Sequence, residues 1–197
     1  MDALEALCTR TSVSSLAEPG PTDAQFETML RAASRAPDHG RMRPWRFIVV
    51  RGDARARLGE VMAAALRLAE PAASAALLER ERRKPLRAPA ILVVAVTLQP
   101  RPGVPEIEQI IAGGAAAQNI LLAAHALGLG AIWRTGERAY DEHVKRALGL
   151  PPNGAVIGFI YLGTPAPDVR PKPAGHPVDT VEWHGPSGAA APPAAPR

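Results

Sequence analysis

Cysteine and aromatic residues are scarce in this chain of 197 residues. The single cysteine, Cys8, excludes an internal disulfide framework and is typical of a protein from a reducing compartment. Aromatic residues make up 4% of the chain, so alanine, leucine and valine must fill the interior. Because hydrophobic residues still amount to 47%, the composition predicts one globular domain with a sizeable core.

The motifs of several large enzyme classes are also missing. The chain has no nucleophile elbow, no HExxH zinc motif, no P-loop and no GxGxxG segment following a strand. Its five histidines stand in unrelated contexts without ligand spacing, so we expect no metal site. If the protein is an enzyme, a cofactor should therefore bring the reactivity.

The excess of positive charge is small and spread out. The formal charge of +4 has no basic tract and no nucleic-acid-binding motif, which favours a small anionic ligand over DNA or RNA. The acidic N-terminus does not resemble a secretory signal, so we expect a cytoplasmic protein. Glycine, glutamine, asparagine and histidine interrupt the long apolar stretch 109–131, which indicates a buried helix and no membrane span.

Helices and strands alternate along the chain, which predicts helices packed around one sheet. A hydroxyl at Thr22 with Gln25 three residues later predicts a capping box, and Pro37 is expected to end the helix that follows. The stretch 90–97 is apolar on both faces and should be a central strand. The predicted helices are 2–9, 22–36, 53–84 with a break near Pro71, 105–127 and 140–148, and the predicted strands are 46–50, 90–97, 131–133 and 155–162.

The C-terminal part changes character. We expect a single domain over residues 1–184, in which 166–184 form an extended arm that packs against this subunit or another. Residues 185–197 are nearly all Gly, Ala, Pro and Ser, so we expect this tail to be disordered.

Three short segments could hold an anionic, planar ligand. Arg10-Thr11-Ser12 offers a guanidinium and two hydroxyls to a phosphate, although a basic residue also commonly ends a helix. Residues 35–39 carry Arg35 and His39 on a proline-stiffened loop before a strand, where ligands are often bound. In the alternative interpretation, Arg35 forms an exposed ion pair and the His39 ring packs against its neighbours. Trp133-Arg134-Thr135-Gly136 repeats the pattern at another strand end, where Trp133 could equally belong to the core.

Two other features favour a structural interpretation. His125 lies on the apolar helix and is expected to be a hydrogen-bonded structural residue. The charged run 79–84 is typical of a solvated helix face.

Taken together, several motifs resemble the nitroreductase family. They are Met1-Asp2-Ala3-Leu4-Glu5, Arg10-x-Ser12, Leu16-Ala17-Glu18-Pro19, Arg35-Ala36-Pro37-Asp38-His39, Pro44-Trp45-x-Phe47, Arg87-Ala88-Pro89, Ile132-Trp133-Arg134-Thr135-Gly136 and Gly158-Phe159-x-Tyr161-Leu162-Gly163-Thr164-Pro165. Within the family the chain is most similar to the compact YdjA-type NAD(P)H nitroreductases. The resemblance covers about residues 1–165.

The resemblance implies an α+β fold, with a central mixed or antiparallel sheet flanked by helices, in an intertwined homodimer that holds FMN at its interface. It implies that Arg10, Thr11, Ser12, Trp133, Arg134 and Thr135 of one subunit bind FMN, while Arg35 and His39 come from the partner. Gly136, Arg170 and Lys172 are further candidates, and the Thr135–Gly136 backbone is expected near flavin N5. The NAD(P)H segment that it implies consists of Ala123, Ala124, His125, Ala126, Leu127 and Gly128.

The activity implied is a ping-pong oxidoreductase reaction, in which NADH or NADPH reduces the flavin and a nitroaromatic, quinone or other acceptor takes the electrons. No side chain need act as a catalytic acid or base. Two alternatives stay open: a flavin-binding or storage protein without turnover, and a flavin enzyme of the same fold with dehalogenating or flavin-cleaving chemistry. Thr11 and Ser15 depart from the family, which often has basic residues at both positions.

Overall fold

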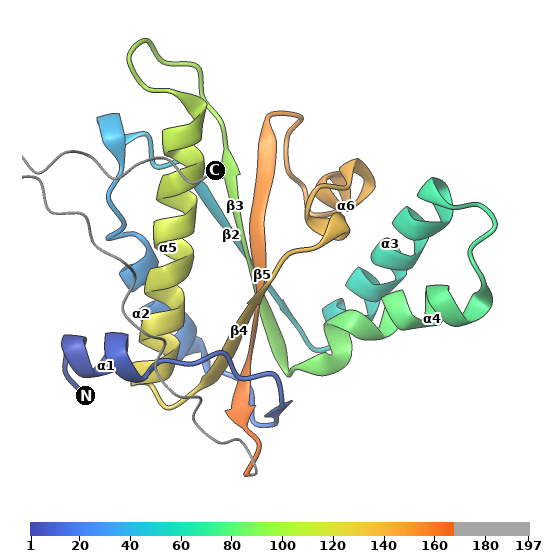
Figure 1. Cartoon of the computed structure of the whole chain (residues 1–197), viewed down its shortest axis with the longest axis horizontal. Coiled ribbons are helices and arrows are strands. Elements are labelled where there is room, and N and C mark those ends of the chain that lie inside the picture. Colours follow the sequence, from blue (N-terminus) through green and yellow to red (C-terminus); the bar gives the residue numbers. More distant parts are fainter. Residues whose placement is uncertain (168–197) are drawn as a thin grey trace, which may run out of the picture.

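The protein is built on one antiparallel sheet, seen in a computed structural model that describes residues 1–167 (Figure 1). Every strand pairing in this part of the chain is antiparallel, in the order β1-β5-β3-β2, with β4 also paired to β5. The strands are β1 (Leu16–Ala17), β2 (Trp45–Arg51), β3 (Ala90–Thr97), β4 (Gly130–Arg134) and β5 (Gly154–Pro165).

Helices cover both faces of the sheet, so the molecule has three layers (Figure 1). Helices α2 and α5 pack on one face, and α3 and α6 pack on the other. The α-helices are α1 (Ala3–Thr9), α2 (Asp23–Ala33), α3 (Ala54–Ala69), α4 (Ala75–Arg83), α5 (Glu106–Ala126) and α6 (Glu142–Ala147), and short 3-10 helices occupy η1 (His39–Arg41), η2 (Lys84–Arg87) and η3 (Glu137–Ala139).

Strand β3 lies between β5 and β2, as its run of apolar residues predicts. Leu92 and Val94 belong to the cluster under α2 and α5, whereas Ile91 and Val93 belong to the cluster under α3 and α6. Because side chains alternate along a strand, a strand buried on both faces must be apolar at every position. The prediction of a central strand is confirmed.

Local signals set several helix ends. The Thr22 hydroxyl accepts from Gln25 N while the Gln25 side chain accepts from Thr22 N, so the predicted capping box is confirmed. The prediction that Pro37 ends this helix is wrong by one turn, because α2 ends at Ala33 with Ser34 as its C-cap. Strand β1 was not predicted, because two residues are too few to show the alternation of apolar and polar side chains. Its partner, β5, also lies far away in the sequence.

Helix α5 has eight buried residues among its 21, and they lie where its apolar stretch packs on the sheet. A Cβ built on Gly113 would lie 2.7 Å from Val96 Cγ1 and 2.8 Å from Ile157 Cγ1, so this glycine lets the helix approach the sheet. The helix is long and apolar enough to cross a membrane by length and composition alone, but its packing on the sheet and on α2 accounts for that character. Its first turns leave Ile107 and Ile111 exposed.

The predicted C-terminal arm and tail fall almost wholly outside the described residues. Only Ala166 and Pro167 of the segment 166–184 are included, and Ala166 N donates to Ser15 O at 3.1 Å. Residues 185–197 lie beyond that limit, so both predictions stay predictions.

Candidate functional site

Strand β4 joins two clefts, one at each of its ends. The backbone N–H of Val13 donates to Ala131 O at 2.9 Å, which places the segment after α1 beside the start of β4. The other end of β4 leads directly into the predicted segment Trp133–Gly136. Since a strand rises about 3.3 Å per residue, the two ends lie roughly 13 Å apart.

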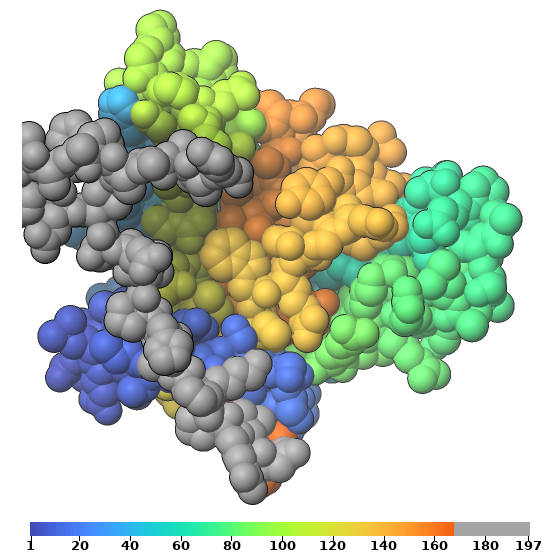
Figure 2. Space-filling view, viewed as in Figure 1, coloured from blue at the N-terminus to red at the C-terminus, as the bar shows by residue number. Residues whose placement is uncertain are grey.

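The cleft at the end of β4, here called the β4 cleft, has a volume of about 410 Å³. Figure 2 shows the yellow turn after β4 bordered by the green end of α4, where the cleft opens. Within residues 1–167, Arg87 and Arg134 pair with no carboxylate, so the cleft presents uncompensated positive charge. Its lining consists of Met62, Lys84, Arg87, Trp133, Arg134, Thr135, Gly136, Glu137, Arg138, Phe159 and Tyr161.

Trp133 is held in place by β5. Its indole Nε1–H donates to Ile157 O at 3.2 Å, and the ring lies against Gly158 so closely that a Cβ there would be 2.0 Å from Nε1. The ring is half-buried and packs against the core cluster that contains α5. Trp133 is therefore both a core residue and a wall of the β4 cleft, so the two interpretations of this residue from the sequence do not exclude each other.

Gly136 has a backbone conformation that only glycine adopts readily, with φ 82° and ψ 179°. A Cβ built there would meet no atom within 4 Å, so open space and not crowding surrounds its α-carbon. The backbone at this turn is therefore accessible to a ligand in the β4 cleft, as the pattern Trp-Arg-Thr-Gly suggests.

A buried ionic network supports the same turn. The side chain of Arg138 is 7% exposed; its Nη1 lies 3.2 Å from Asp141 Oδ2 and its Nη2 lies 3.1 Å from Glu137 Oε2. Its Nε lies 3.8 Å from Glu81 Oε2, and Glu81 Oε1 also pairs with Lys84. Helix α4, η2 and η3 are thereby joined behind the cleft, which fixes Lys84 relative to the turn.

The network corrects one prediction and supplies residues that the sequence analysis missed. The run 79–84 is not simply a solvated face, because Glu81 is 4% exposed and Lys84 lines the cleft. The sequence does not show which residue of a charged run points inward, because helical periodicity is visible only when polar and apolar residues alternate. Arg87 and Tyr161 stood in the family motifs without an assigned role, and both line the β4 cleft.

The second cleft, here called the N-terminal cleft, brings Arg10 and Thr11 together with His125 and Gly128. Arg10 is the C-cap of α1, which agrees with the structural interpretation without opposing the functional one. The N-terminal cleft has a volume of about 340 Å³. Ser12 is exposed and is not part of the cleft wall. Part of the segment predicted for NAD(P)H thus shares a cleft with part of the segment predicted for the flavin phosphate.

His125 has a structural role in the fold. Its Nε2 lies 2.8 Å from Thr9 Oγ1, and the Thr9 hydroxyl donates to Glu5 O at 2.6 Å. Because that hydroxyl has one hydrogen, it accepts from the His125 Nε2–H. The expectation of a hydrogen-bonded structural histidine is confirmed, and the bond ties α1 to the end of α5.

Arg35 and His39 lie away from both clefts. Arg35 lines a separate hollow with Ala123 and Ala126, between α1 and α5. His39 Nδ1 is 2.5 Å from Glu108 Oε2, near the N-terminal end of α5. The structure therefore does not bring these residues to Arg134 or Arg10 of the same chain, and Arg170 and Lys172 lie outside the described residues.

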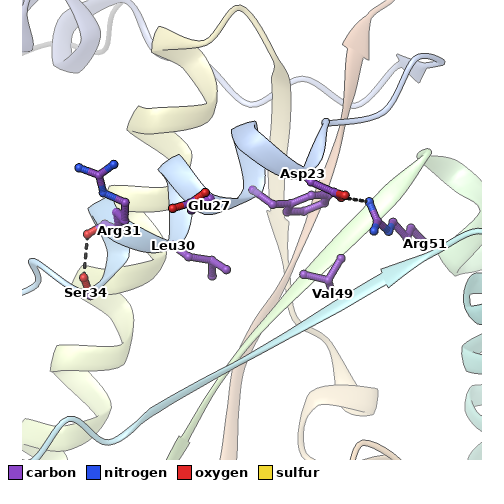
Figure 3. A pocket seen from close by; sticks show the side chains of 8 residues that line it. Asp23, Glu27, Leu30, Arg31, Ser34, Val49 and Arg51 are labelled. Atoms are coloured by element: carbon purple, nitrogen blue, oxygen red, sulfur yellow. Dashed lines mark hydrogen bonds and ion pairs between the residues drawn. The ribbon is translucent and has the colours of Figure 1, made fainter.

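A larger hollow of about 630 Å³ lies between α2 and the outer edge of β2 (Figure 3). Figure 3 shows the ion pair between Asp23 and Arg51, 2.5 Å apart, and the Val49 side chain across from Leu30. None of the predicted site residues lines this hollow, and its charged groups are exposed. We therefore take the clefts at β4, not this hollow, as the candidate site. Residues 1–167 also contain no group of three potential metal ligands.

Comparison with known proteins identifies the family of this chain. The model of the nitroreductase family matches residues 8–164, so the chain belongs to the nitroreductase family. An Escherichia coli K12 protein named "Putative NAD(P)H nitroreductase YdjA" is 41% identical over 170 residues, which cover 84% of this chain and 89% of that protein. A Haemophilus influenzae protein named "Putative NAD(P)H nitroreductase" is 33% identical, covering 83% and 89%.

Solved structures show the same fold. A nitroreductase-like protein of Bacillus cereus aligns with a TM-score of 0.77 over 93% of this chain and 97% of its own, at 24% identity. A Desulfovibrio desulfuricans protein, solved as "a putative nitroreductase in complex with fmn", aligns with a TM-score of 0.68 at 29% identity, covering 89% of this chain and 91% of its own. The α+β class with helices flanking an antiparallel sheet is thereby confirmed.

Proposed function

We propose that this protein is an FMN-dependent NAD(P)H oxidoreductase of the nitroreductase type. The observation that carries the proposal is the arrangement along β4, which has a loop with Arg10 and Thr11 at one end and a cationic, flat-walled cleft at the other. FMN has a phosphate at one end and a planar ring at the other. The Desulfovibrio desulfuricans relative contains FMN, and the two bacterial relatives are named for NAD(P)H.

The residues present fit such a cofactor. Arg10 and Thr11, with Ser12 beside them, would bind the phosphate and ribityl end through charge-assisted hydrogen bonds. Trp133, Arg134 and Thr135, with the open backbone at Gly136, would bind the ring. Lys84 and Arg87 add two cations to this cleft, where they would stabilise negative charge on the ligand.

When bound, FMN would supply the redox chemistry by taking a hydride from NADH or NADPH and passing electrons to a nitroaromatic, quinone or other acceptor. The chain would bind and orient the ring against Trp133 and the turn at Gly136. It would also leave part of the cleft open for nicotinamide and acceptor in turn. Residues 123–128 are proposed to contact NAD(P)H, because His125 and Gly128 line the cleft that holds Arg10.

The functional unit is proposed to be a homodimer in the cytoplasm. Arg35 and His39 line neither the β4 cleft nor the N-terminal cleft of their own chain, so they could contact the flavin only from a second copy. The exposed Ile107 and Ile111 on α5 offer apolar surface for such a contact.

An absorbance spectrum of the purified protein tests the proposal. We expect flavin bands, or their appearance after addition of FMN, and bleaching on anaerobic addition of NADPH or NADH. A flavin-binding protein without turnover would keep its colour with both nicotinamides. A protein that stays colourless in excess FMN would refute the proposal.

Substitution of Arg10 tests the assignment of the site. Arg10→Ala should weaken FMN binding by about 1.5–3 kcal/mol, because a hydrogen bond to a charged group is lost. Fluorescence titration of the apoprotein with FMN measures the Kd. Arg67→Ala removes an exposed arginine from the last turn of α3 and serves as the control of equal charge. Equal FMN affinity in both variants would count against Arg10 as a ligand.

A further inference from the structure

The loop before β2 holds two arginines in a backbone conformation that arginine rarely adopts. Arg41 has φ 54° and Arg43 has φ 47°, and Gly40 beside them has φ 71°. Glycine adopts this left-handed region freely and asparagine adopts it more readily than arginine, so either residue would suit both positions better. An outlier of this kind indicates a function for the side chains that carry it.

Side chains from the segment after β3 hold this loop in place. Gln99 Nε2 donates to Met42 O at 3.2 Å. Arg101 Nη1 donates to Gly40 O and lies 3.5 Å from Met42 Sδ. Gln109 of α5 is 1% exposed and holds the Gln99 backbone, accepting from its N–H at 2.9 Å and donating to its carbonyl at 2.8 Å. The loop is therefore supported from a buried residue, and the Arg101 guanidinium is fixed against it.

Three exposed arginines gather positive charge on this loop, and we call Arg41, Arg43 and Arg101 together the arginine surface. Within residues 1–167 none of their guanidinium groups pairs with a carboxylate. Two acids of the same region have other partners: Asp38 Oδ2 accepts from the Arg43 backbone N–H at 2.6 Å, and Glu108 pairs with a histidine of the loop. Because guanidinium groups bind phosphates through paired hydrogen bonds, the surface suits a phosphorylated ligand.

The arginine surface is separate from the clefts along β4, since none of its residues lines either of them. It is nevertheless close to His39, which is proposed to contact the flavin of a second copy. Arg41 stands two residues after His39, so their α-carbons lie at most about 7 Å apart. In the proposed dimer the arginine surface would therefore lie beside a flavin. The part of the nicotinamide donor that extends beyond the flavin must lie on the surface around it.

The two possible donors differ in one charged group. NADPH carries a phosphate on the adenosine ribose that NADH lacks, and arginine is the residue that accommodates this 2′-phosphate in dinucleotide-binding folds. We propose that Arg41, Arg43 and Arg101 bind the 2′-phosphate of NADPH, and that the protein therefore uses NADPH in preference to NADH. The proposal rests on the proposed function and adds to it the choice between the donors. The phosphate would supply the negative charge that these guanidinium groups lack.

Arg41→Asn and Arg43→Asn test the proposal, because asparagine tolerates the left-handed backbone and removes the charge. The FMN-loaded enzyme is assayed with NADPH and with NADH against one quinone acceptor. We expect each variant to lower kcat/KM for NADPH about tenfold, through a higher KM, as for one lost charge-assisted hydrogen bond. The value for NADH should stay unchanged. Arg67→Ala removes an exposed charge from α3 and is the control, which should change neither value.

Binding of adenosine 2′,5′-bisphosphate gives a second measurement, which does not depend on turnover. By calorimetry we expect the wild type to bind it about tenfold more tightly than adenosine 5′-monophosphate, and Arg41→Asn to lose most of that difference. Urea unfolding checks the fold of the variants, whose midpoints should equal or exceed that of the wild type because asparagine suits the backbone better.

The outcomes separate this proposal from the proposed function. Equal losses with both donors would refute the 2′-phosphate site, because the arginines would then contact the pyrophosphate that both donors share or only shape the loop. A wild type that uses NADH as well as NADPH would also refute the site, while the function stands. If neither donor reduces the flavin, the proposed function falls and the calorimetry decides this proposal: equal affinity for the two adenosine nucleotides refutes it, and a difference that Arg41→Asn removes supports it.

Discussion

Gly158→Ala should displace Trp133 and thereby weaken both the fold and the β4 cleft. A Cβ at this position would lie 2.0 Å from Trp133 Nε1 and 2.5 Å from Cδ1, whereas ordinary contact begins near 3.4 Å. The ring must therefore shift by at least about 1.4 Å, which breaks the bond from Nε1 to Ile157 O. Overpacking costs about 1–3 kcal/mol and the lost hydrogen bond about 1 kcal/mol. Since alanine is favoured over glycine in a strand by up to about 1 kcal/mol, the net loss should be about 1–4 kcal/mol.

Urea unfolding at fixed protein concentration measures this loss, and FMN titration measures the effect on the cleft. Gly114→Ala is the matched control, because a Cβ there would meet the same ring at 4.0 Å, from the side of α5. That variant should be as stable as the wild type or about 1 kcal/mol more stable, as expected for alanine in a helix.

A double-mutant cycle decides whether the ring is the cause. In a Trp133→Ala background, Gly158→Ala should cost nothing, because the atoms that it would strike are gone. An equal cost of Gly158→Ala in both backgrounds would refute the argument. A stable Gly158→Ala protein with unchanged FMN affinity would refute it as well.

Three further substitutions test other parts of the structure. His125→Ala removes the hydrogen bond to Thr9 Oγ1, so the free energy of unfolding should fall by about 1 kcal/mol and amide hydrogen exchange in α1 should become faster. Exchange rates in α1 equal to those of the wild type would contradict the role of this bond in holding α1 on α5. Glu81→Gln leaves Lys84 and Arg138 without their shared buried carboxylate and should cost about 3 kcal/mol in urea unfolding, whereas Glu79→Gln, at a more exposed site, should cost under about 1 kcal/mol. Because burial raises the pKa of Tyr161 above its ordinary 10.0, the unfolded chain ionises first, and the wild type should lose stability relative to Tyr161→Phe as pH rises above that value. An equal stability difference between the two proteins at about pH 8 and about pH 11 would contradict this sign.

Elements with strong local signals could be predicted from the sequence. The apolar run of β3 and the long alanine-rich helix α5 were predicted to within a residue at each end, since their character is repeated over many positions. The capping residue Thr22 was predicted because its partner, Gln25, stands three residues away. Strand β1 and the early end of α2 depend on contacts or dihedral choices that no short pattern encodes.

The residues of the candidate site could likewise be predicted only where the signal is local. Arg10, Thr11, Trp133, Arg134 and Thr135 could be singled out because each arginine stands beside hydroxyls or a flat ring in the chain. Their distribution between two clefts could not be predicted, because it depends on the antiparallel register of β4 and on the bond from Val13 to Ala131. Lys84 was hidden among neighbouring charges, and its position depends on a buried contact with Glu81.

Tyr161 shows what the sequence could have indicated and why it was passed over. It is the one residue with a polar side chain in the run 154–163, in a strand whose other positions are glycine or apolar. In a strand paired on both sides, a phenol must find a partner, reach water or carry a cost. The pattern could therefore have suggested a polar contact or access to water, but only the fold shows that the residue lines the cationic cleft.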